Sequence, residues 1–229
     1  MKATLVDTLQ LTPDVRHFVF EASEVEKLDF LPGQFASLSQ VIGGREITRA
    51  YSFASAPGSG NRFELCLNHV PHGHFSEWLF ELKPGGAVEM RPPMGTFTLH
   101  HRDREVFFVA TGTGIAPFRS MLKAHLNEST PGITLIFGTR YEHGLLYRAE
   151  FQEMARRFPQ FHFQPVLSRP EPGWQGLVGH VQEHLKDALG DRRDVDVYLC
   201  GLKEMVNETR KLLKEIGFDR KQIFYEKYD

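Results

Sequence analysis

The chain has 229 residues and a mass of 26.2 kDa, and 41% of its residues are hydrophobic and 24% charged. This composition is ordinary for a globular protein of one large domain or two smaller ones, and it excludes a disordered chain. The formal net charge of −2 gives no basic excess, so nothing favours a nucleic acid or an anionic membrane surface as a partner.

The cysteines and the N-terminus indicate a cytoplasmic protein. Cys66 and Cys200 lie far apart in the sequence, as reduced buried thiols do, and two thiols cannot ligate an ordinary iron–sulfur cluster. The first 18 residues lack the apolar segment of a signal peptide. No stretch approaches 18 uncharged apolar residues, so we expect no membrane span.

The first hundred residues have the pattern of a small all-β domain with one short helix at 76–82. Glycine and proline turns separate the apolar runs, which predicts an antiparallel barrel or sandwich. The expected strands lie at 17–22, 33–41, 50–55, 62–70, 87–93 and 95–100.

After residue 100 the pattern changes to alternating strands and helices. Strands are expected at 105–111, 133–138, 161–168, 196–201 and 222–228, and helices at 115–127, 145–158, 178–189 and 203–217. The last helix ends at Gly217, as a glycine after a helix terminus predicts. Five strands and four helices in alternation predict a doubly wound five-stranded parallel sheet. We therefore expect one domain at 1–100 and a second at 101–229, with the linker at 100–104.

Glycines and arginines lie at the expected carboxyl ends of the later strands, where open α/β sheets bind ligands. The turn 111–117 has free N–H groups and a helix dipole that suit a pyrophosphate, although an ordinary tight turn gives the same pattern. Arg140 stands where an NAD-binding chain has an acid for the ribose 2′-OH, and Ser168 and Arg169 end the next strand. These groups suit a 2′-phosphate and favour NADPH, with solvated surface arginines as the alternative.

Two segments of the first half suit a flavin or a phosphate. Arg49 and Tyr51 share one face of an extended segment, where they could bind a phosphate and stack on a planar ring. An amphipathic barrel strand would give the same alternation. In the segment 73–76, Ser76 can cap a short helix and complete a second phosphate cradle.

Three histidines, His69, His72 and His74, cluster near this helix. Their spacing is not that of a helical pair, and no carboxylate or cysteine lies in local register. We expect no metal here, but exposed loop histidines or flavin contacts.

Six segments in order resemble the ferredoxin–NADP⁺ reductase superfamily, and most closely its bacterial FAD-containing ferredoxin (flavodoxin)–NADP⁺ reductases. They are R-x-Y-S at 49–52, G-x-x-S at 73–76, PPMGTFTL at 92–99, VATGTGIAPFRSML at 109–122, C-G-x-x-x-M at 200–205 and the terminal E-x-aromatic at 226–228. The resemblance implies an N-terminal antiparallel Greek-key barrel for FAD and a C-terminal domain for NADP(H).

The resemblance also implies individual roles. Arg49 would neutralise the flavin diphosphate, Tyr51 would stack on the isoalloxazine, and Ser52 would hydrogen-bond near flavin N5. The further FAD contacts implied are Ala50, Asn68, His69, Val70, His74, Phe75, Ser76, Thr113 and Tyr228. The NADP contacts implied are Thr113, Cys200 and Gly201, to which the strand-end pattern described above adds Gly114, Arg140, Ser168 and Arg169. The residues implied around the reacting rings are Ser52, Cys200, Glu226 and Tyr228.

The implied function is hydride transfer between nicotinamide C4 and flavin N5, with the rings held about 3–3.5 Å apart. The flavin would exchange single electrons with a separate ferredoxin or flavodoxin-like carrier, and the protein would be a monomer or weak dimer. Two features depart from the family: Asp229 follows the terminal aromatic, and residues 173–181 look more like the W-x-G-x-x-G segment of NADH-dependent oxygenase reductases. The alternatives are such a reductase, a free-flavin reductase, or a non-catalytic electron-transfer or regulatory subunit.

Overall fold

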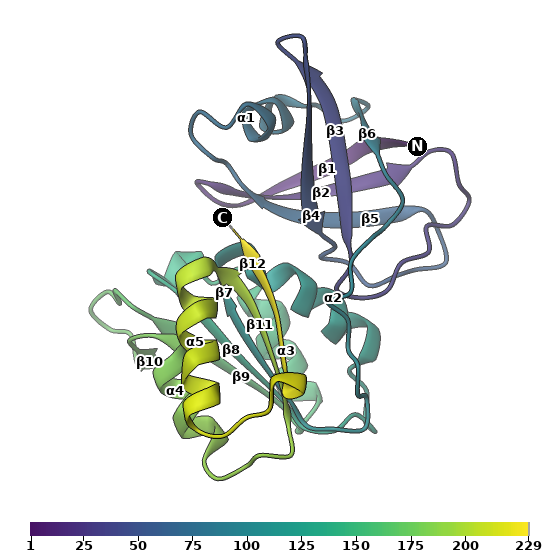
Figure 1. Ribbon diagram of the computed structural model, residues 1–229. Coiled ribbons are helices and arrows are strands. Elements are labelled where there is room, and N and C mark those ends of the chain that lie inside the picture. Colours follow the sequence, from purple (N-terminus) through teal and green to yellow (C-terminus); the bar gives the residue numbers. More distant parts are fainter. Residues whose placement is uncertain (229) are drawn as a thin grey trace. The chain divides into compact units, whose positions relative to one another are not determined.

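The computed structural model describes residues 1–228, which form two compact units. The first unit contains residues 1–99 together with 116–124, and the second contains residues 100–115 and the described chain from 125 onward. Figure 1 shows the antiparallel strands of the first unit and the parallel strands and helices of the second. Helix α2 (Ala116–His125) therefore belongs mostly with the N-terminal strands, although it follows the first strand of the second unit.

The first unit is built on a six-stranded antiparallel sheet in the order β4-β3-β6-β1-β2-β5. Its strands are β1 (Lys2–Thr12), β2 (Val15–Ala22), β3 (Phe35–Ile42), β4 (Arg45–Ser52), β5 (Arg62–Asn68) and β6 (Ala87–Met90). A bridge between Phe53 and Leu65 joins the end of β4 to β5. The Ala54 N–H also donates to the Glu64 carbonyl at 2.7 Å, so the two edges of the sheet meet. The predicted antiparallel barrel is confirmed.

Several strands differ from the sequence prediction. The prediction lacks strand β1, because only the start of its sequence alternates cleanly between buried and exposed positions. The expected strand at 95–100 does not form. Met94 makes a single bridge to Phe35, and Gly95, at φ 112°, then turns the chain away from the sheet. Phe97 is nevertheless buried and its ring contacts that of Phe118 in α2, so an apolar side chain there is covered without belonging to a strand.

Aromatic side chains fill the core of the barrel. Phe18, Phe20 and Phe63 are fully buried, and their rings form a stack with centroids 6.1 and 5.6 Å apart. Helix α1 (His74–Glu81) buries Phe75 and Leu79 in the same core. This packing fixes the start of α1 beside the end of β4.

The second unit contains a parallel sheet in the order β10-β9-β8-β7-β11-β12. Its strands are β7 (Val106–Thr111), β8 (Ile133–Thr139), β9 (Phe161–Leu167), β10 (Leu177–Val178), β11 (Asp196–Leu202) and β12 (Ile223–Tyr228). Its helices are α3 (Arg148–Arg157), α4 (Val181–Leu189) and α5 (Lys203–Glu215), with short 3₁₀ turns η1 (Gly112–Ile115), η2 (Glu142–Gly144) and η3 (Arg220–Gln222). The five predicted strands are present, and the two-residue β10 adds a sixth. The strand order reverses between β7 and β11, which is the position where such sheets bind ligands.

Helix α5 ends as its sequence predicts. Gly217 adopts φ 95°, its N–H donates to the Lys214 carbonyl at 3.1 Å, and the N–H of Phe218 donates to the Leu213 carbonyl at 2.9 Å. These two bonds are those of a Schellman motif, which needs a residue that tolerates positive φ. No helix within residues 1–228 is long and apolar enough to cross a membrane.

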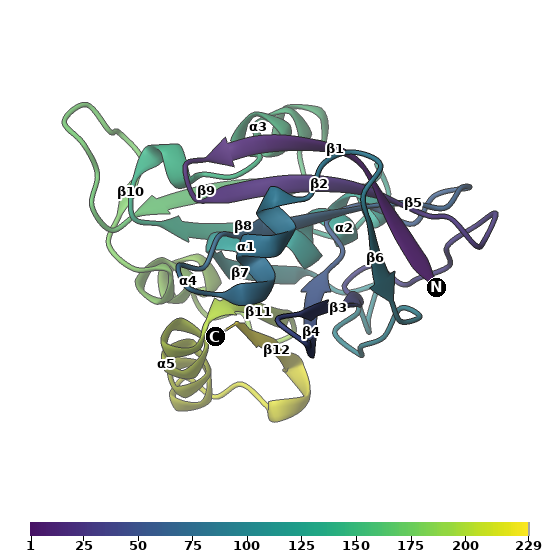
Figure 2. The ribbon, with the colours of Figure 1, turned by 90° about the horizontal axis from the view of Figure 1, so that it is seen from above.

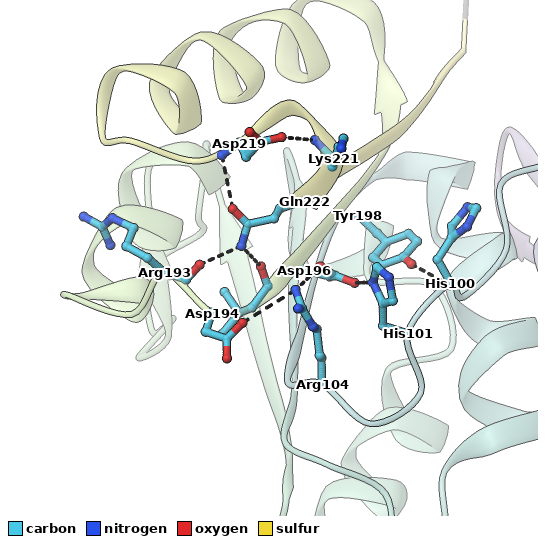
Figure 3. Close-up of polar contacts among 11 residues, drawn as sticks. His100, His101, Arg104, Arg193, Asp194, Asp196, Tyr198, Asp219, Lys221 and Gln222 are labelled. Carbon is cyan, nitrogen blue, oxygen red and sulfur yellow. Dashed lines mark hydrogen bonds and ion pairs between the residues drawn. The ribbon is translucent and has the colours of Figure 1, made fainter.

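The segment expected as a linker is bound to the parallel sheet (Figure 3). The His100 N–H donates to the Tyr198 hydroxyl at 2.9 Å, and the His101 Nδ1 lies 2.6 Å from a carboxylate oxygen of the fully buried Asp196. Burial raises the pKa of Tyr198 to about 12; the His100 bond opposes that rise, and the nearby Asp196 adds to it. These contacts hold residues 100 and 101 against the amino-terminal ends of the strands of the parallel sheet. The glycine turns lie at the opposite, carboxyl ends of the strands.

Candidate active site

Strand β4 presents the R-x-Y-S residues at the end of the barrel. Arg49 is exposed and donates to its neighbour's carbonyl, that of Thr48, at 2.9 Å, whereas Tyr51 is half-buried. The Tyr51 ring lies 6.1 Å from the ring of Phe75 in α1, at an angle of 34°. Burial raises the pKa of Tyr51 to about 12, and the adjacent Arg49 charge acts in the opposite direction. The site thus offers a neutral phenol ring beside an exposed guanidinium, with Ala50 exposed and Ser52 buried.

Helix α1 begins close to this strand, and its first turn carries no side-chain cap. Gly73 is the N-cap, so the prediction that Ser76 caps the helix is wrong: the helix starts two residues before Ser76, at His74. The Ser76 hydroxyl instead accepts the Val70 N–H at 3.1 Å and donates to the Gly73 carbonyl at 2.9 Å. It therefore holds the preceding turn in place, while His74 is exposed and Phe75 is buried.

The backbone before α1 is tightly constrained. The His69 N–H donates to the Asp14 carbonyl at 2.7 Å, and the Val70 N–H is bound by Ser76. These two amides are thus bonded within the protein, so a ring facing this segment would contact other atoms. The Val70 side chain is 52% exposed, and Asn68 is exposed at the end of β5.

The residues of the first unit fit FAD. A Cβ at Gly73 would lie only 2.8 Å from the Ser76 Oγ and 2.9 Å from the Val70 carbonyl oxygen, so glycine is required where the uncapped helix begins. An uncapped helix N-terminus attracts phosphate through its free N–H groups and dipole. Together with Arg49 and the Tyr51 ring, it supplies what a diphosphate and a planar ring need.

The second unit brings its predicted residues together at the strand-order reversal. Gly114 packs so closely on β11 that a Cβ there would lie 2.4 Å from the Cys200 carbonyl oxygen. Gly201 adopts φ 137°, and a Cβ there would lie only 2.3 Å from the Thr111 Oγ1. Thr111 also accepts the Leu202 N–H at 3.1 Å. These glycines therefore join the ends of β7 and β11 and place the buried Thr113 beside them.

Cys200, Glu226 and Tyr228 meet at the ends of β11 and β12. The parallel register pairs Cys200 with Glu226 and Leu202 with Tyr228. Burial raises the pKa of the Cys200 thiol well above its usual range, the Glu226 carboxylate adds to the rise, and a hydrogen bond from Tyr228 acts against it. The thiol is therefore neutral at physiological pH and not an activated nucleophile. Asp229 lies outside the described residues.

Arg140, Ser168 and Arg169 lie at the ends of β8 and β9, on the far side of β7 from Cys200. The Arg169 N–H donates to the Arg140 carbonyl at 2.8 Å, and the Ser168 N–H donates to the Thr139 carbonyl at 3.0 Å. Both arginines are exposed and Ser168 is half-buried. The backbone thus brings Arg140, Ser168 and Arg169 to the same corner of the sheet.

Some structural features of the site go beyond the sequence prediction. The sequence indicates Thr111 only as part of the strand and turn, yet its hydroxyl binds β11. Arg148 and Trp174, described below, contact each other from segments 26 residues apart in sequence, so no local pattern could pair them. Among residues 1–228, no group of three or more histidine, cysteine or acidic side chains could hold a metal ion.

Two family models match the chain. The oxidoreductase FAD-binding domain matches residues 2–99, and the oxidoreductase NAD-binding domain matches residues 108–211. These matches correspond to the barrel and to most of the parallel sheet.

Individual relatives match all or nearly all of the chain. Ferredoxin–NADP reductase B of Sorangium cellulosum is 38% identical over 100% of this chain and 97% of its own length. The anthranilate 1,2-dioxygenase electron transfer component of Acinetobacter baylyi is 31% identical over 99% of this chain and 66% of its own. Among solved structures, the Amycolatopsis cytochrome P450 reductase GcoB superposes with a TM-score of 0.88 at 28% identity, covering 99% of this chain and 69% of that one. The chain belongs to the ferredoxin–NADP reductase family of FAD-dependent oxidoreductases.

Proposed function

We propose that the protein transfers electrons between NADPH and a separate one-electron carrier of the ferredoxin or flavodoxin type, acting in the cytoplasm as a monomer or weak dimer. Residues 1–100 would bind FAD and residues 101–229 the nucleotide. Bound FAD would supply the redox chemistry by exchanging a hydride with nicotinamide and single electrons with the carrier. The relative from Sorangium cellulosum, named as a ferredoxin–NADP reductase, supports this choice of donor and acceptor.

On the flavin side, the chain's own groups would bind and orient. Arg49 and the free N–H groups at the start of α1 would neutralise the diphosphate. The neutral ring of Tyr51 would stack on the isoalloxazine, and Ser52 would hydrogen-bond near its N5. None of these groups needs to change its charge.

On the nucleotide side, the turn at Thr113 and Gly114 would receive the pyrophosphate, and Cys200 and Gly201 would lie beside the nicotinamide. Because the Cys200 thiol is neutral, it would not act as a nucleophile. It would instead adjust the contact with the nicotinamide. Glu226 and Tyr228 would complete this end of the sheet.

The observation that carries the choice of NADPH is the backbone hydrogen bond from the Arg169 N–H to the Arg140 carbonyl. It places two arginines at adjacent strand ends, where a 2′-phosphate could be bound by both. Steady-state kinetics with NADPH and NADH test it. Arg169→Ala should raise the KM for NADPH about tenfold and leave that for NADH nearly unchanged, since one charge-assisted contact is lost. Equal effects on the two nucleotides would refute the phosphate assignment.

A second candidate is an NADH-dependent reductase component that supplies an oxygenase. Its argument from sequence is a resemblance alone: Trp174, Gly176 and Gly179 match the W-x-G-x-x-G pattern of such reductases. The relative from Acinetobacter baylyi, named as the electron transfer component of a dioxygenase, favours an oxygenase as the acceptor. A wild-type kcat/KM that is higher for NADH than for NADPH would favour this candidate.

A further inference from the structure

Trp174 organises the loop between β9 and β10, which begins at Ser168 and carries Arg169. The indole Nε1 donates to the Leu177 carbonyl at 3.1 Å. Its ring lies against Gly176, where a Cβ would come within 2.3 Å of the ring carbon Cζ2. The loop thus folds back around the indole before β10 pairs with β9. It projects from the sheet next to β10 (Figures 1 and 2).

This packing gives the W-x-G-x-x-G pattern a structural explanation. Position 176 requires glycine because the indole ring of Trp174 occupies the space that a Cβ would need. Gly179 adopts φ 111°, and a Cβ there would lie 2.5 Å from a carboxylate oxygen of Glu183. Both glycines therefore serve the path of the loop, and the pattern by itself does not select NADH.

Arg148, at the start of α3, contacts this loop through the Trp174 ring. Its guanidinium carbon lies 5.5 Å from the centre of the Trp174 ring, and its Nη1 donates to Glu142. The Nε is buried and has no hydrogen-bond partner among the described residues, and the preceding Tyr147 adopts the left-handed φ of 57°. A buried donor and a left-handed tyrosine both cost free energy, so the surrounding contacts must hold this arrangement.

We propose that Arg148 and Trp174 are positioning residues for nucleotide choice: they hold the loop so that Arg169 stays beside Arg140. The inference rests on the proposed use of NADPH. Arg169 is exposed, and its backbone is fixed near Arg140 by the bond at 2.8 Å. A fixed loop reduces the freedom that the long Arg169 side chain loses when a 2′-phosphate binds.

The test is calorimetric binding of 2′,5′-ADP and of 5′-AMP to the full, FAD-loaded protein. The two probes differ in the 2′-phosphate, and their binding does not depend on turnover. Trp174→Ala should weaken 2′,5′-ADP binding about fivefold, as coupled neighbours do, and leave 5′-AMP binding unchanged. Trp174→Phe keeps a ring for Arg148 and should retain most of the affinity.

The double variant separates positioning from general stability. In an Arg169→Ala background, Trp174→Ala should have no further effect on 2′,5′-ADP binding, because its influence acts through Arg169. Equal weakening of both probes, or a full additional loss in the double variant, would overturn the inference. If Arg169→Ala does not discriminate between the probes, the proposed use of NADPH fails first. Far-UV circular dichroism and FAD content verify folding, and Arg148→Gln serves for the same comparison if Trp174→Ala does not fold.

Discussion

Glu64 and Arg119 form an ion pair that ties helix α2 to the barrel, and neutralising it should cost about 2 kcal/mol of unfolding free energy. The Arg119 Nη1 lies 2.5 Å from the Glu64 Oε2 and donates to the Ala54 carbonyl at 2.8 Å. The arginine side chain is only 8% exposed and the glutamate 27%. Glu64→Gln keeps the size of the side chain but removes the carboxylate charge that faces the buried Arg119 guanidinium.

Glu21 and Arg62 provide a matched control on neighbouring strands. Their closest atoms lie 3.2 Å apart, but the side chains are 38% and 65% exposed. Solvent screens such a pair, so Glu21→Gln should cost at most about 0.5 kcal/mol. Urea unfolding measures the loss of unfolding free energy in both variants, provided that their m-values equal that of wild type. Equal losses in the two variants would show that burial does not determine the strength of the Glu64–Arg119 pair.

The same pair should make stability depend on pH. Burial by itself would raise the pKa of Glu64, but the hydrogen bond and charge of Arg119, with Lys123 and His17, lower it below 4.5. A folded pKa below the unfolded one stabilises the protein above the unfolded value, and this stability is lost as the pH falls through the folded value. The difference in unfolding free energy between wild type and Glu64→Gln should therefore narrow from about pH 6 to about pH 3. A difference that stays constant over this range would contradict the assignment.

Substitutions and labelling in each of the two units give three more tests. Tyr51→Ala should reduce the FAD that copurifies, whereas Tyr51→Phe should retain it; unchanged flavin content and absorbance in the alanine variant would refute the stacking role. Cys200 and Cys66 are both buried, so a thiol reagent should label neither until the protein unfolds, and rapid labelling of Cys200 in the folded protein would contradict its burial and its raised pKa. Gly201→Ala should cost about 2–4 kcal/mol, because it forces a Cβ against Thr111 at positive φ; a melting temperature equal to that of wild type would show that the strand ends adjust freely.

The class of each half of the chain follows from local sequence signals. Repeated turns predicted an antiparallel barrel or sandwich, strand–helix alternation predicted the parallel sheet, and glycine placement predicted the end of α5 and the glycine turn after β7. Hydrophobic periodicity and the freedom of glycine to adopt positive φ act over a few residues, so these features need no knowledge of the fold. Strand β1 escaped prediction for the same reason, because its half-exposed pattern gains meaning only when β2 and β6 pair with it.

Which residues meet depends on contacts between distant segments. The register of β11 and β12 sets Glu226 beside Cys200, which lies 26 residues earlier in the chain. The bond between Arg169 and Arg140, and the packing of Arg148 on Trp174, depend on how β8, β9 and their loops align. Such pairings require long-range strand register, and a shift of one residue would separate them without changing the local pattern of any segment.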